Sequence, residues 1–369
     1  MPLEVRVQAG GGALDYPVRI GLGLRGEVVG HLRDVAPNVA RWAVVSDENV
    51  SPLYGADIAA ALEGAGLGGD LLTVPAGEAH KNRGQWAALS DALLGLEYGR
   101  DGGIVAVGGG VVGDLAGFVA ATFMRGIPVV QVPTSLLAMI DASVGGKTGV
   151  DTPHGKNLVG AFHPPRVVLV DPETIATLPR GERSNGLAEA LKHAAILDEA
   201  YGERVVAAAG DVLEADPDAV LGVVHRSVEL KADVVSRDER EGGLREILNF
   251  GHTIGHAIEQ ASGYEMAHGR AVASGMLWEA ALGEALGVSQ KGVEAQLRAW
   301  LGAAELPSAR AEIDPAEIGD LIRLDKKVRA GSPRVVLLAR VGVVAKAEGS
   351  WSHRVTDDEL RLHLERLAR

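Results

Sequence analysis

Histidine side chains recur at short intervals between Leu248 and Ala271, in the stretch LNFGHTIGHAIEQASGYEMAHGRA. His252 and His256 are four residues apart in an apolar pattern with helical spacing, so both imidazoles should share one face of a helix. His268 follows after a Ser-Gly turn. Imidazole is a common ligand of divalent metals, so the stretch predicts a metal site, although two hydrogen-bonded helix histidines would give the same pattern.

A carboxylate for this site is present in a second helical pattern, Asn185 to His193, whose polar stripe contains Glu189, Lys192 and His193. A catalytic zinc site combines imidazole and carboxylate ligands and leaves one position for water or substrate. Because the chain has no cysteine, any metal must be held by nitrogen and oxygen ligands. Spacing alone does not select the ligands from five candidates: Glu189, His193, His252, His256 and His268.

A glycine-rich segment, GGGVVGDLAG, follows the buried strand pattern Gly103 to Val107. Its glycines Gly108, Gly110 and Gly113 match G-x-G-x-x-G between a strand and a helix, where backbone N–H groups face a pyrophosphate. No carboxylate lies about 20 residues further on to hold a ribose hydroxyl, as the dinucleotide fingerprint requires. Either other loops bind the cofactor, or the site is not specific for a dinucleotide.

A second glycine-rich segment reads PTSLLAMIDASVGGKTGVDTPHGKN. Its Gly146-Lys147-Thr148 resembles the end of a P-loop, but Asp141 stands where that motif needs glycine, and a helical run precedes it instead of a strand. The NTPase interpretation is therefore rejected. What remains is a glycine-flanked Lys147 with four polar or charged residues close by: Asp141, Asp151, Lys156 and Asn157. A solvated charged loop would give the same pattern, but the low charge density of the surrounding sequence argues against it.

The elements that must position these residues change character near residue 175. Before it, a hairpin pattern is followed by short apolar runs that alternate with helical patterns: Leu3–Val7, Tyr16–Ile20, Arg41–Ser46, Ala56–Glu63, Asp70–Val74, Trp86–Leu96, Gly103–Val107, Ile127–Val132 and Val167–Val170. This order predicts an α/β nucleotide-binding domain, a parallel sheet with flanking helices, over residues 1–175. Helical patterns dominate afterwards, so we expect a mainly α-helical metal- and substrate-binding domain over residues 176–369.

The charge balance limits the classes of partner that the protein is expected to bind. With 49 acidic and 36 basic residues the formal net charge is −13, which argues against a nucleic-acid partner and makes any cation cluster a candidate site for a small anion. No apolar run approaches the roughly 20 residues of a membrane span, and the N-terminus lacks the pattern of a signal peptide. The absence of cysteine fits a reducing compartment. We therefore expect a soluble, cytoplasmic protein with no membrane partner.

A dinucleotide loop, a metal-bearing helical domain and several cations together describe an enzyme that oxidises an alcohol on a polyanionic substrate. The cations near the singled-out segments are Arg125, Lys147, Lys156, Lys192, Lys231 and Arg245.

Several motifs, in this order, resemble the 3-dehydroquinate synthase family from about residue 40 to about residue 330: PAGEAHK, GGGVVGDLAGF, PTSLLAMIDASVGGKTGVDTPHGKN, GLAEALKH and LNFGHTIGHAIE with a later HG. The resemblance implies tightly bound NAD, zinc or cobalt, and a homodimer. It also implies a shikimate-pathway reaction of aromatic amino acid biosynthesis, which converts 3-deoxy-D-arabino-heptulosonate 7-phosphate to 3-dehydroquinate and phosphate. Transient oxidation by NAD, phosphate elimination, re-reduction and intramolecular aldol closure are its implied steps.

The resemblance also implies residue roles. The metal ligands would be Glu189, His252 and His268, whereas His256 would contact the substrate phosphate. The substrate would be held by Asp141, Lys147, Asn157, Lys192, Lys231, Arg245 and Asn249, by Arg125 across a dimer interface, and by one of Lys326 and Lys327. NAD would contact Glu78, Lys81, Gly110, Val111, Val112, Gly113, Asp114, Thr134, Ser135, Lys147, Lys156 and Thr177.

One position departs from the family pattern, because Arg270 follows His268-Gly269 where the family usually has HGE. Loss of an acid so close to a ligand could weaken a metal site about 10 to 100-fold. We expect instead that Arg270 lies in a surface ion pair with an exchanged partner, since the other residues that carry the chemistry are in place.

Three alternative functions differ in what they require. A metal- and NAD-dependent polyol dehydrogenase would need neither the anion-binding set nor the GKN loop. Sibling sugar-phosphate cyclases act on substrates without the carboxylate, so their sites should lack some of these cations. A binding-only homologue silenced at Arg270 would bind NAD without turnover.

Overall fold

The computed structural model describes residues 2–8, 15–307, 314–324, 333–347 and 349–368. The chain divides into two compact units, Met1–Leu178 with Val220–Ser236, and Pro179–Ala219 with Arg237–Arg369. The predicted division at residue 175 differs from this in one respect: the segment Val220–Ser236, expected in the second domain, packs with the first unit. A helical pattern shows which face is apolar but not which neighbour covers it.

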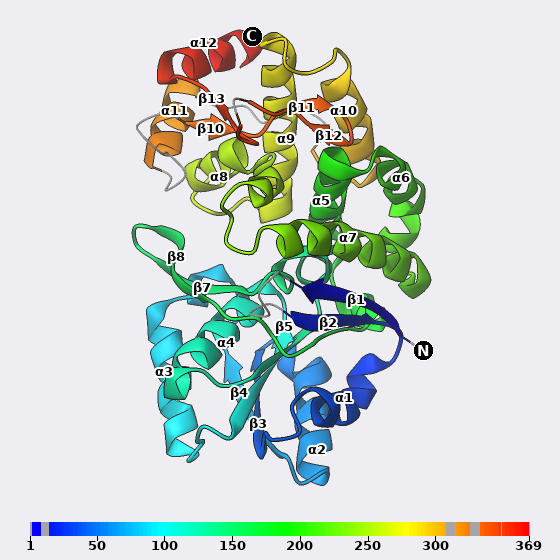
Figure 1. Ribbon diagram of the computed structural model, residues 1–369, viewed down its shortest axis with the longest axis vertical. Helices are drawn as coiled ribbons and strands as arrows, with labels where there is room; N and C mark the ends of the chain where they lie inside the picture. Colours follow the sequence, from blue (N-terminus) through cyan, green and yellow to red (C-terminus); the bar gives the residue numbers. More distant parts are fainter. Residues whose placement is uncertain (1, 9–14, 308–313, 325–332, 348, 369) are drawn as a thin grey trace. The chain divides into compact units, whose positions relative to one another are not determined.

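The first unit is built on a seven-stranded sheet with the order β1-β2-β9-β6-β5-β3-β4 (Figure 1). Its strands are β1 Leu3–Gln8, β2 Asp15–Ile20, β3 Arg41–Asp47, β4 Gly68–Val74, β5 Gly102–Gly108, β6 Val129–Pro133 and β9 Val168–Val170. Only the β1–β2 pair is antiparallel among these neighbours. The predicted hairpin and the predicted parallel sheet are therefore both confirmed.

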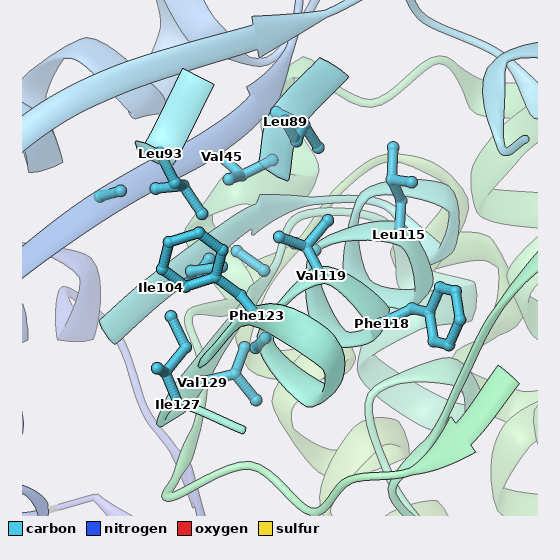
Figure 2. Close-up of a cluster of buried hydrophobic side chains, with 14 of the residues drawn as sticks. Val45, Leu89, Leu93, Ile104, Leu115, Phe118, Val119, Phe123, Ile127 and Val129 are labelled. Carbon is cyan, nitrogen blue, oxygen red and sulfur yellow. The ribbon is translucent and has the colours of Figure 1, made fainter. Parts of the chain in front are cut away.

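Two helices cover each face of this sheet. They are α1 Val28–Val35 and α2 Ala56–Gly64 on one side, and α3 Arg83–Gly95 and α4 Gly110–Thr122 on the other. Successive strand residues face opposite sides, so Val44 packs with the first pair of helices and Val45 with the second. Figure 2 shows the second cluster, in which Leu93 of α3 and Val119 of α4 surround Ile104. Both faces are apolar because both are buried.

The segment that carries Lys147, Lys156 and Asn157, in which the sequence analysis placed no strand, forms a β-hairpin. Strand β7, Lys147–Thr152, pairs with β8, Gly155–Phe162, in an antiparallel ribbon. The buried Val150 of β7 belongs to the core that includes α4. Frequent glycine and charged residues hide the alternating pattern that would have indicated these strands. The first unit also contains most of α7, Pro217–Arg237, and short helical segments that include η5, Ala138–Ala142, and η6, Pro172–Thr177.

The second unit is mainly helical, as predicted (Figure 1). Its helices are α5 Arg180–Leu197, α6 Glu199–Leu213, η7 Leu244–Asn249, α8 His252–Ala261, α9 His268–Ala285, α10 Val293–Ala303, α11 Pro315–Leu324 and α12 Asp357–Ala368. Two small ribbons pair β10 Arg334–Val335 with β13 His353–Arg354, and β11 Leu338–Arg340 with β12 Val343–Val344. Among the described helices, none has the length and apolar content needed to cross a bilayer.

Helix α5 differs from the amphipathic helix that the sequence predicts. It is buried continuously from Ser184 to Ile196, because α6, α9 and α10 pack around it. The predicted polar stripe therefore lies inside the unit, with Glu189, Lys192 and His193 each at most 1% exposed. Charged residues are rarely buried in this way unless they are paired or bind an ion.

Candidate functional site

Three side chains of the second unit direct their ligand atoms toward one another. Glu189 lies in the middle of α5, whereas His252 and His268 are the first residues of α8 and α9. Nε2 of His252 lies 3.7 Å from Glu189 Oε1, and Nε2 of His268 lies 3.8 Å from the same oxygen. A ligand atom from each of the three lies within 4.8 Å of the other two, as in a group that could hold one metal ion.

The carboxylate of Glu189 tests whether these residues fit a metal. Neither of its oxygens accepts a hydrogen bond from any described residue, although the Lys192 ammonium forms an ion pair with one of them. The Lys192 ammonium lies at Oε2, but Oε1, which both imidazole Nε2 atoms approach, is a buried acceptor that is destabilised unless a further donor or cation compensates it. A divalent ion beside Glu189 would supply that compensation, with the oxygen and nitrogen ligands that zinc accepts. The residues present therefore fit a metal.

A second partner contacts each imidazole from behind. Nδ1 of His252 lies 3.1 Å from the Phe250 carbonyl oxygen, so we assign the proton to Nδ1 and the lone pair to Nε2. Nδ1 of His268 lies 3.6 Å from Glu259 Oε2. Carboxylates and carbonyls in these positions orient metal-binding histidines. Glu259 is missing from the predicted site, and its only sequence signal is its position three residues after His256.

His256 does not belong to the group around Glu189. Its ring centroid lies 5.1 Å from that of His252 and 5.9 Å from that of His268. With Glu259 and His268 it forms a separate group of ligand atoms within 4.8 Å of one another. The histidines that share one helix face are therefore not the pair that meets at Glu189, and phosphate contact by His256 stays a prediction.

Two further predicted residues of the second unit lie on η7. Nη1 of Arg245 donates a hydrogen bond to the Glu239 carbonyl oxygen at 2.6 Å. Nδ2 of Asn249 donates to Glu241 Oε1 at 2.7 Å. These contacts hold both side chains in defined positions. Glu241 is a second residue that the sequence prediction missed, because it lies in a short polar segment without a motif.

Arg270 is the third residue of α9 and is exposed. It makes no ion pair with any residue that the structure describes, so the expected exchange of ion-pair partner is not found. Exposure agrees with the expectation that this side chain lies on the surface. Lys326 and Lys327, of which one was expected to contact phosphate, lie outside the described residues.

The glycine-rich segment of the first unit has the predicted strand–loop–helix geometry. Helix α4 begins at Gly110 directly after β5. The backbone N–H groups and the dipole of a helix N-terminus favour a phosphate there. The predicted residues Thr134 and Ser135 follow β6, which pairs with β5, and the Thr134 N–H donates to the Gly108 carbonyl oxygen at 2.9 Å. Two adjacent strands therefore bring these predicted NAD contacts to one edge of the sheet.

A carboxylate missed by the sequence analysis lies at the end of a strand beside this loop. Asp47 is the last residue of β3, and β3 pairs with β5 in parallel. Its Oδ1 accepts the N–H groups of Asn49 and Val50 at 2.9 and 3.0 Å. In the dinucleotide fingerprint the carboxylate follows the glycine motif in the chain. Asp47 precedes the motif instead, because β3 comes before β5 in the chain. The sequence signal for Asp47 was its position as an acidic residue directly after the predicted run Arg41–Ser46.

Lys81 is the centre of a cluster of charges in the first unit. Its Nζ lies 2.7 Å from Glu78 Oε1, 3.4 Å from Asp114 Oδ2 and 3.8 Å from Asp151 Oδ1, and Lys156 lies 3.7 Å from Glu78. Burial raises the pKa of Asp114 to about 6; the Lys81 ammonium opposes this shift and Glu78 adds to it. Burial lowers the pKa of Lys81, but the three carboxylates outweigh burial and raise it. Four predicted NAD contacts therefore lie together.

Two predicted substrate contacts meet in the first unit although they are far apart in the sequence. Lys231 lies on α7, and its Nζ donates to Asp141 Oδ1 at 2.7 Å and to the Asp141 carbonyl oxygen at 2.5 Å. Lys231 is only 5% exposed. A cation this deeply buried needs its anionic partner, so the pair holds α7 against η5.

The remaining predicted residues of the first unit are more accessible. Lys147 begins β7 and is exposed, and Asn157 of β8 has a left-handed backbone with φ 52°. Arg125 is also exposed and left-handed, with φ 70°. Oγ1 of Thr177, at the end of η6, lies 2.7 Å from the Tyr54 hydroxyl. Because Lys147, Asn157 and Arg125 are exposed, a ligand can reach all three side chains.

Comparison with known proteins matches both parts of the chain to one family. The model described as 3-dehydroquinate synthase N-terminal matches residues 71–185, and the model described as 3-dehydroquinate synthase C-terminal matches residues 186–328. The 3-dehydroquinate synthase of Symbiobacterium thermophilum is 47% identical over 356 residues, which cover 96% of this chain and 98% of that protein.

Two solved structures are similar over nearly the whole chain. 2-Deoxy-scyllo-inosose synthase, complexed with carbaglucose-6-phosphate, NAD+ and Co2+, is 25% identical with a TM-score of 0.89 and covers 99% of each chain. The 2-epi-5-epi-valiolone synthase from Streptomyces hygroscopicus subsp. jinggangensis, with NAD+ and Zn2+ bound, is 28% identical with a TM-score of 0.84 and covers 96% of each chain.

Proposed function

Because the chain belongs to the 3-dehydroquinate synthase family, we propose that it is a carbon–oxygen lyase that converts 3-deoxy-D-arabino-heptulosonate 7-phosphate to 3-dehydroquinate and phosphate. The observation that carries this proposal is the buried Glu189 carboxylate, whose Oε1 has no hydrogen-bond partner among the described residues and lies beside two imidazole Nε2 atoms. NAD and either zinc or cobalt are the cofactors. The similar cyclases contain NAD+ together with Co2+ or Zn2+, which supports this assignment.

Glu189, His252 and His268 would hold the metal. When bound, the metal supplies Lewis acidity toward the hydroxyl to be oxidised, and NAD supplies a reversible hydride acceptor. The chain's own contribution at this site is orientation, because the Phe250 carbonyl directs one imidazole and Lys192 contacts the Glu189 carboxylate. Lys192 also brings a positive charge to the buried Glu189 carboxylate.

The substrate is an anion with a carboxylate and a phosphate, so its binding requires cations and hydrogen-bond donors. We assign this role to the residues that the family resemblance implies: Arg125, Asp141, Lys147, Asn157, Lys192, Lys231, Arg245, Asn249 and His256. Neutralising the phosphate strengthens binding and also stabilises the leaving group during elimination. Holding the reacting groups of one substrate in position can supply roughly 7 to 11 kcal/mol of a barrier, which suits a reaction that ends in an intramolecular closure.

The NAD site is assigned to the loop after β5 and the charges around Lys81. Backbone N–H groups at the start of α4 would face the pyrophosphate. Asp47 at the end of β3 would accept a hydrogen bond from a ribose hydroxyl. It would take the place of the carboxylate that this chain lacks after its glycine motif. Glu78, Lys81, Asp114 and Lys156 would contact the rest of the cofactor as one cluster of ion-paired side chains.

The alternatives are less well supported. A polyol dehydrogenase does not need the buried Lys231 and Arg245, each of which is at most 5% exposed. The two sibling cyclases are only 25% and 28% identical, against 47% for the 3-dehydroquinate synthase. All the described cations expected for a substrate with a carboxylate are present, whereas a sibling cyclase should lack some of them.

We also propose that the protein acts as a homodimer in the cytoplasm. Leu158 and Phe162 are exposed apolar side chains on the same face of β8, and a second copy would cover them. The absence of cysteine agrees with a reducing compartment. Light scattering at micromolar concentration tests the dimer, and a monomer at that concentration contradicts it.

The decisive experiment measures phosphate release from the heptulosonate phosphate with metal-free and metal-replete protein. Release should stop after chelation, return with zinc or cobalt, and be lost in Glu189→Ala. Glu317→Ala, an exposed glutamate on α11, is the matched control and should behave as wild type. Phosphate release that survives both chelation and Glu189→Ala refutes the proposal. Net NADH formation from a simple alcohol, without phosphate release, would instead identify a polyol dehydrogenase.

A further inference from the structure

Glu279 on α9 is a fully buried carboxylate at the start of α8. Its Oε2 accepts the Gly251 N–H at 2.6 Å, and its Oε1 accepts the N–H groups of Thr253 and Ile254 at 3.1 and 3.3 Å. The first N–H groups of a helix have no partner inside the helix, and a negative charge is favourable beside them. Nothing in the assigned chemistry uses Glu279, and its sequence context is an apolar helix.

One peptide group connects Glu279 to the candidate metal ligand. Glu279 accepts a hydrogen bond from the Gly251 N–H, and the Phe250 carbonyl oxygen lies 3.1 Å from His252 Nδ1. This N–H and this carbonyl belong to the same planar peptide unit. The carboxylate therefore polarises one end of this amide, while the imidazole donates to its other end. Hydrogen bonds in such a chain strengthen one another in a low dielectric.

This chain of contacts decides which nitrogen of His252 is available. Because Nδ1 donates to the Phe250 carbonyl, Nε2 retains the lone pair, and Nε2 is the atom that lies 3.7 Å from Glu189 Oε1. The orientation of the carbonyl depends in turn on Gly251. Its φ of 77° is left-handed, and a Cβ at this position would lie 2.5 Å from Met276 Cγ, so only glycine fits the turn.

We propose that Glu279 is a positioning residue: through the Phe250–Gly251 peptide group it fixes the tautomer and orientation of His252, and so raises the affinity of the site for its metal. This inference rests on the proposed function, because it requires that His252 is a ligand. Residues that orient metal-binding histidines typically change metal affinity about 10 to 100-fold when they are removed.

The same helix provides a matched control. Glu284 on α9 also accepts a backbone N–H, that of Glu294 at 2.9 Å, near the start of α10. Glu279 and Glu284 thus make the same kind of contact from one helix, but only Glu279 acts on a peptide group that contacts His252. Glutamine at either position keeps the side-chain size, removes the charge, and replaces one acceptor oxygen by an NH2 group that faces N–H donors.

The experiment compares metal-free wild type, Glu279→Gln and Glu284→Gln. Cobalt and zinc dissociation constants come from competition with a chelator, and the His252 tautomer comes from nitrogen-15 NMR of the metal-free protein. We expect Glu279→Gln to bind metal about 10 to 100-fold more weakly and to lose the single tautomer with its proton on Nδ1. Glu284→Gln should keep the wild-type affinity and tautomer.

A purely structural role predicts a different result. In that case Glu279→Gln unfolds at a lower temperature but keeps the wild-type dissociation constant and tautomer, and this outcome overturns the proposal. If Glu279→Gln does not fold, Glu279→Asp retains the charge with a shorter reach. It should weaken metal binding by a smaller factor, and unchanged affinity in folded Glu279→Asp overturns the proposal as well.

The two proposals fail in distinguishable ways. If wild-type protein binds no cobalt, or binds it independently of Glu189, the proposed function fails. If wild-type protein binds cobalt and releases phosphate while Glu279→Gln binds cobalt equally well, only the role of Glu279 is wrong.

Discussion

The backbone N–H of Gly269 donates a hydrogen bond to Asn185 Oδ1 at 2.5 Å, which ties the start of α9 to α5. Asn185 lies one helical turn before Glu189, and Gly269 follows His268 directly. A Cβ on Gly269 would lie 2.0 Å from the Asn185 carbonyl oxygen. The missing side chain at Gly269 is therefore what allows the two helices to bring Glu189 and His268 together.

Gly269→Ala should weaken the metal site and the fold together. The added methyl group cannot fit against the Asn185 backbone, so α9 must move away from α5 and carry His268 with it. We expect the cobalt dissociation constant to rise at least about tenfold, and the free energy of unfolding to fall by about 1 to 3 kcal/mol. Cobalt titration and urea unfolding measure the two effects.

Gly210→Ala is the control for this substitution. Gly210 lies on α6, and a Cβ added there would meet no neighbouring atom within 4 Å, so alanine should be neutral or stabilise the helix by up to about 1 kcal/mol. Equal metal affinity in Gly269→Ala and Gly210→Ala would show that the close approach at Gly269 does not position the ligands.

Much of the sheet was predictable, because buried parallel strands are short apolar runs bounded by glycine or charge. The runs beginning at Arg41 and Gly103 became β3 and β5 almost without change. The hairpin β7–β8 was missed because its strands carry glycine and charge in place of alternating apolar residues. The place of helix α7 in the first unit could not be predicted, since the buried partner of its Lys231, Asp141, is distant in sequence.

The proposed metal ligands could not be chosen from spacing, because Glu189 and His193 lie one turn apart on a buried helix and either could face the histidines. The starts of α8 and α9 select Glu189, since both Nε2 atoms approach its Oε1. Family resemblance, not helix geometry, identified this set. Glu279 had no local signal at all, because its role depends on a peptide group of another helix.

Arg270→Glu, which restores the acid usual in the family, should change little. Arg270 is exposed and makes no ion pair with a described residue, and exposed substitutions away from special features usually change stability by at most about 0.5 kcal/mol. We expect metal affinity and the rate of phosphate release to stay within about twofold of wild type. A gain of about tenfold or more in metal affinity would show that Arg270 weakens the site, as a silenced homologue requires.

Lys231→Met should impair substrate binding more than it impairs the fold. It removes a buried ammonium from Asp141 while it retains most of the apolar stem. We expect the free energy of unfolding to fall by about 1.5 to 3 kcal/mol, the range for a hydrogen bond to a charged group. KM for the heptulosonate phosphate should rise about tenfold or more if Lys231 binds substrate. A variant with the same loss of stability but unchanged KM and kcat would restrict Lys231 to a structural role.

NAD binding and stability should respond to pH in opposite directions through Asp114. Burial raises the pKa of Asp114 from 3.8 to about 6, with Lys81 opposing and the carboxylates of Glu78 and Asp151 adding to the shift. Between these values the folded protein binds more protons than the unfolded chain, so ionisation of Asp114 lowers stability as pH rises toward 6. The ionised carboxylate is, however, the form that accepts hydrogen bonds from the cofactor without donating one, so NAD affinity should fall as pH drops below about 6. Calorimetric titration of NAD between pH 5 and 8 measures this fall in affinity.

Asp114→Asn should remove the pH dependence of NAD affinity, whereas Asp91→Asn, at an exposed position, should keep it. An unchanged pH profile in Asp114→Asn would assign the titration to another group.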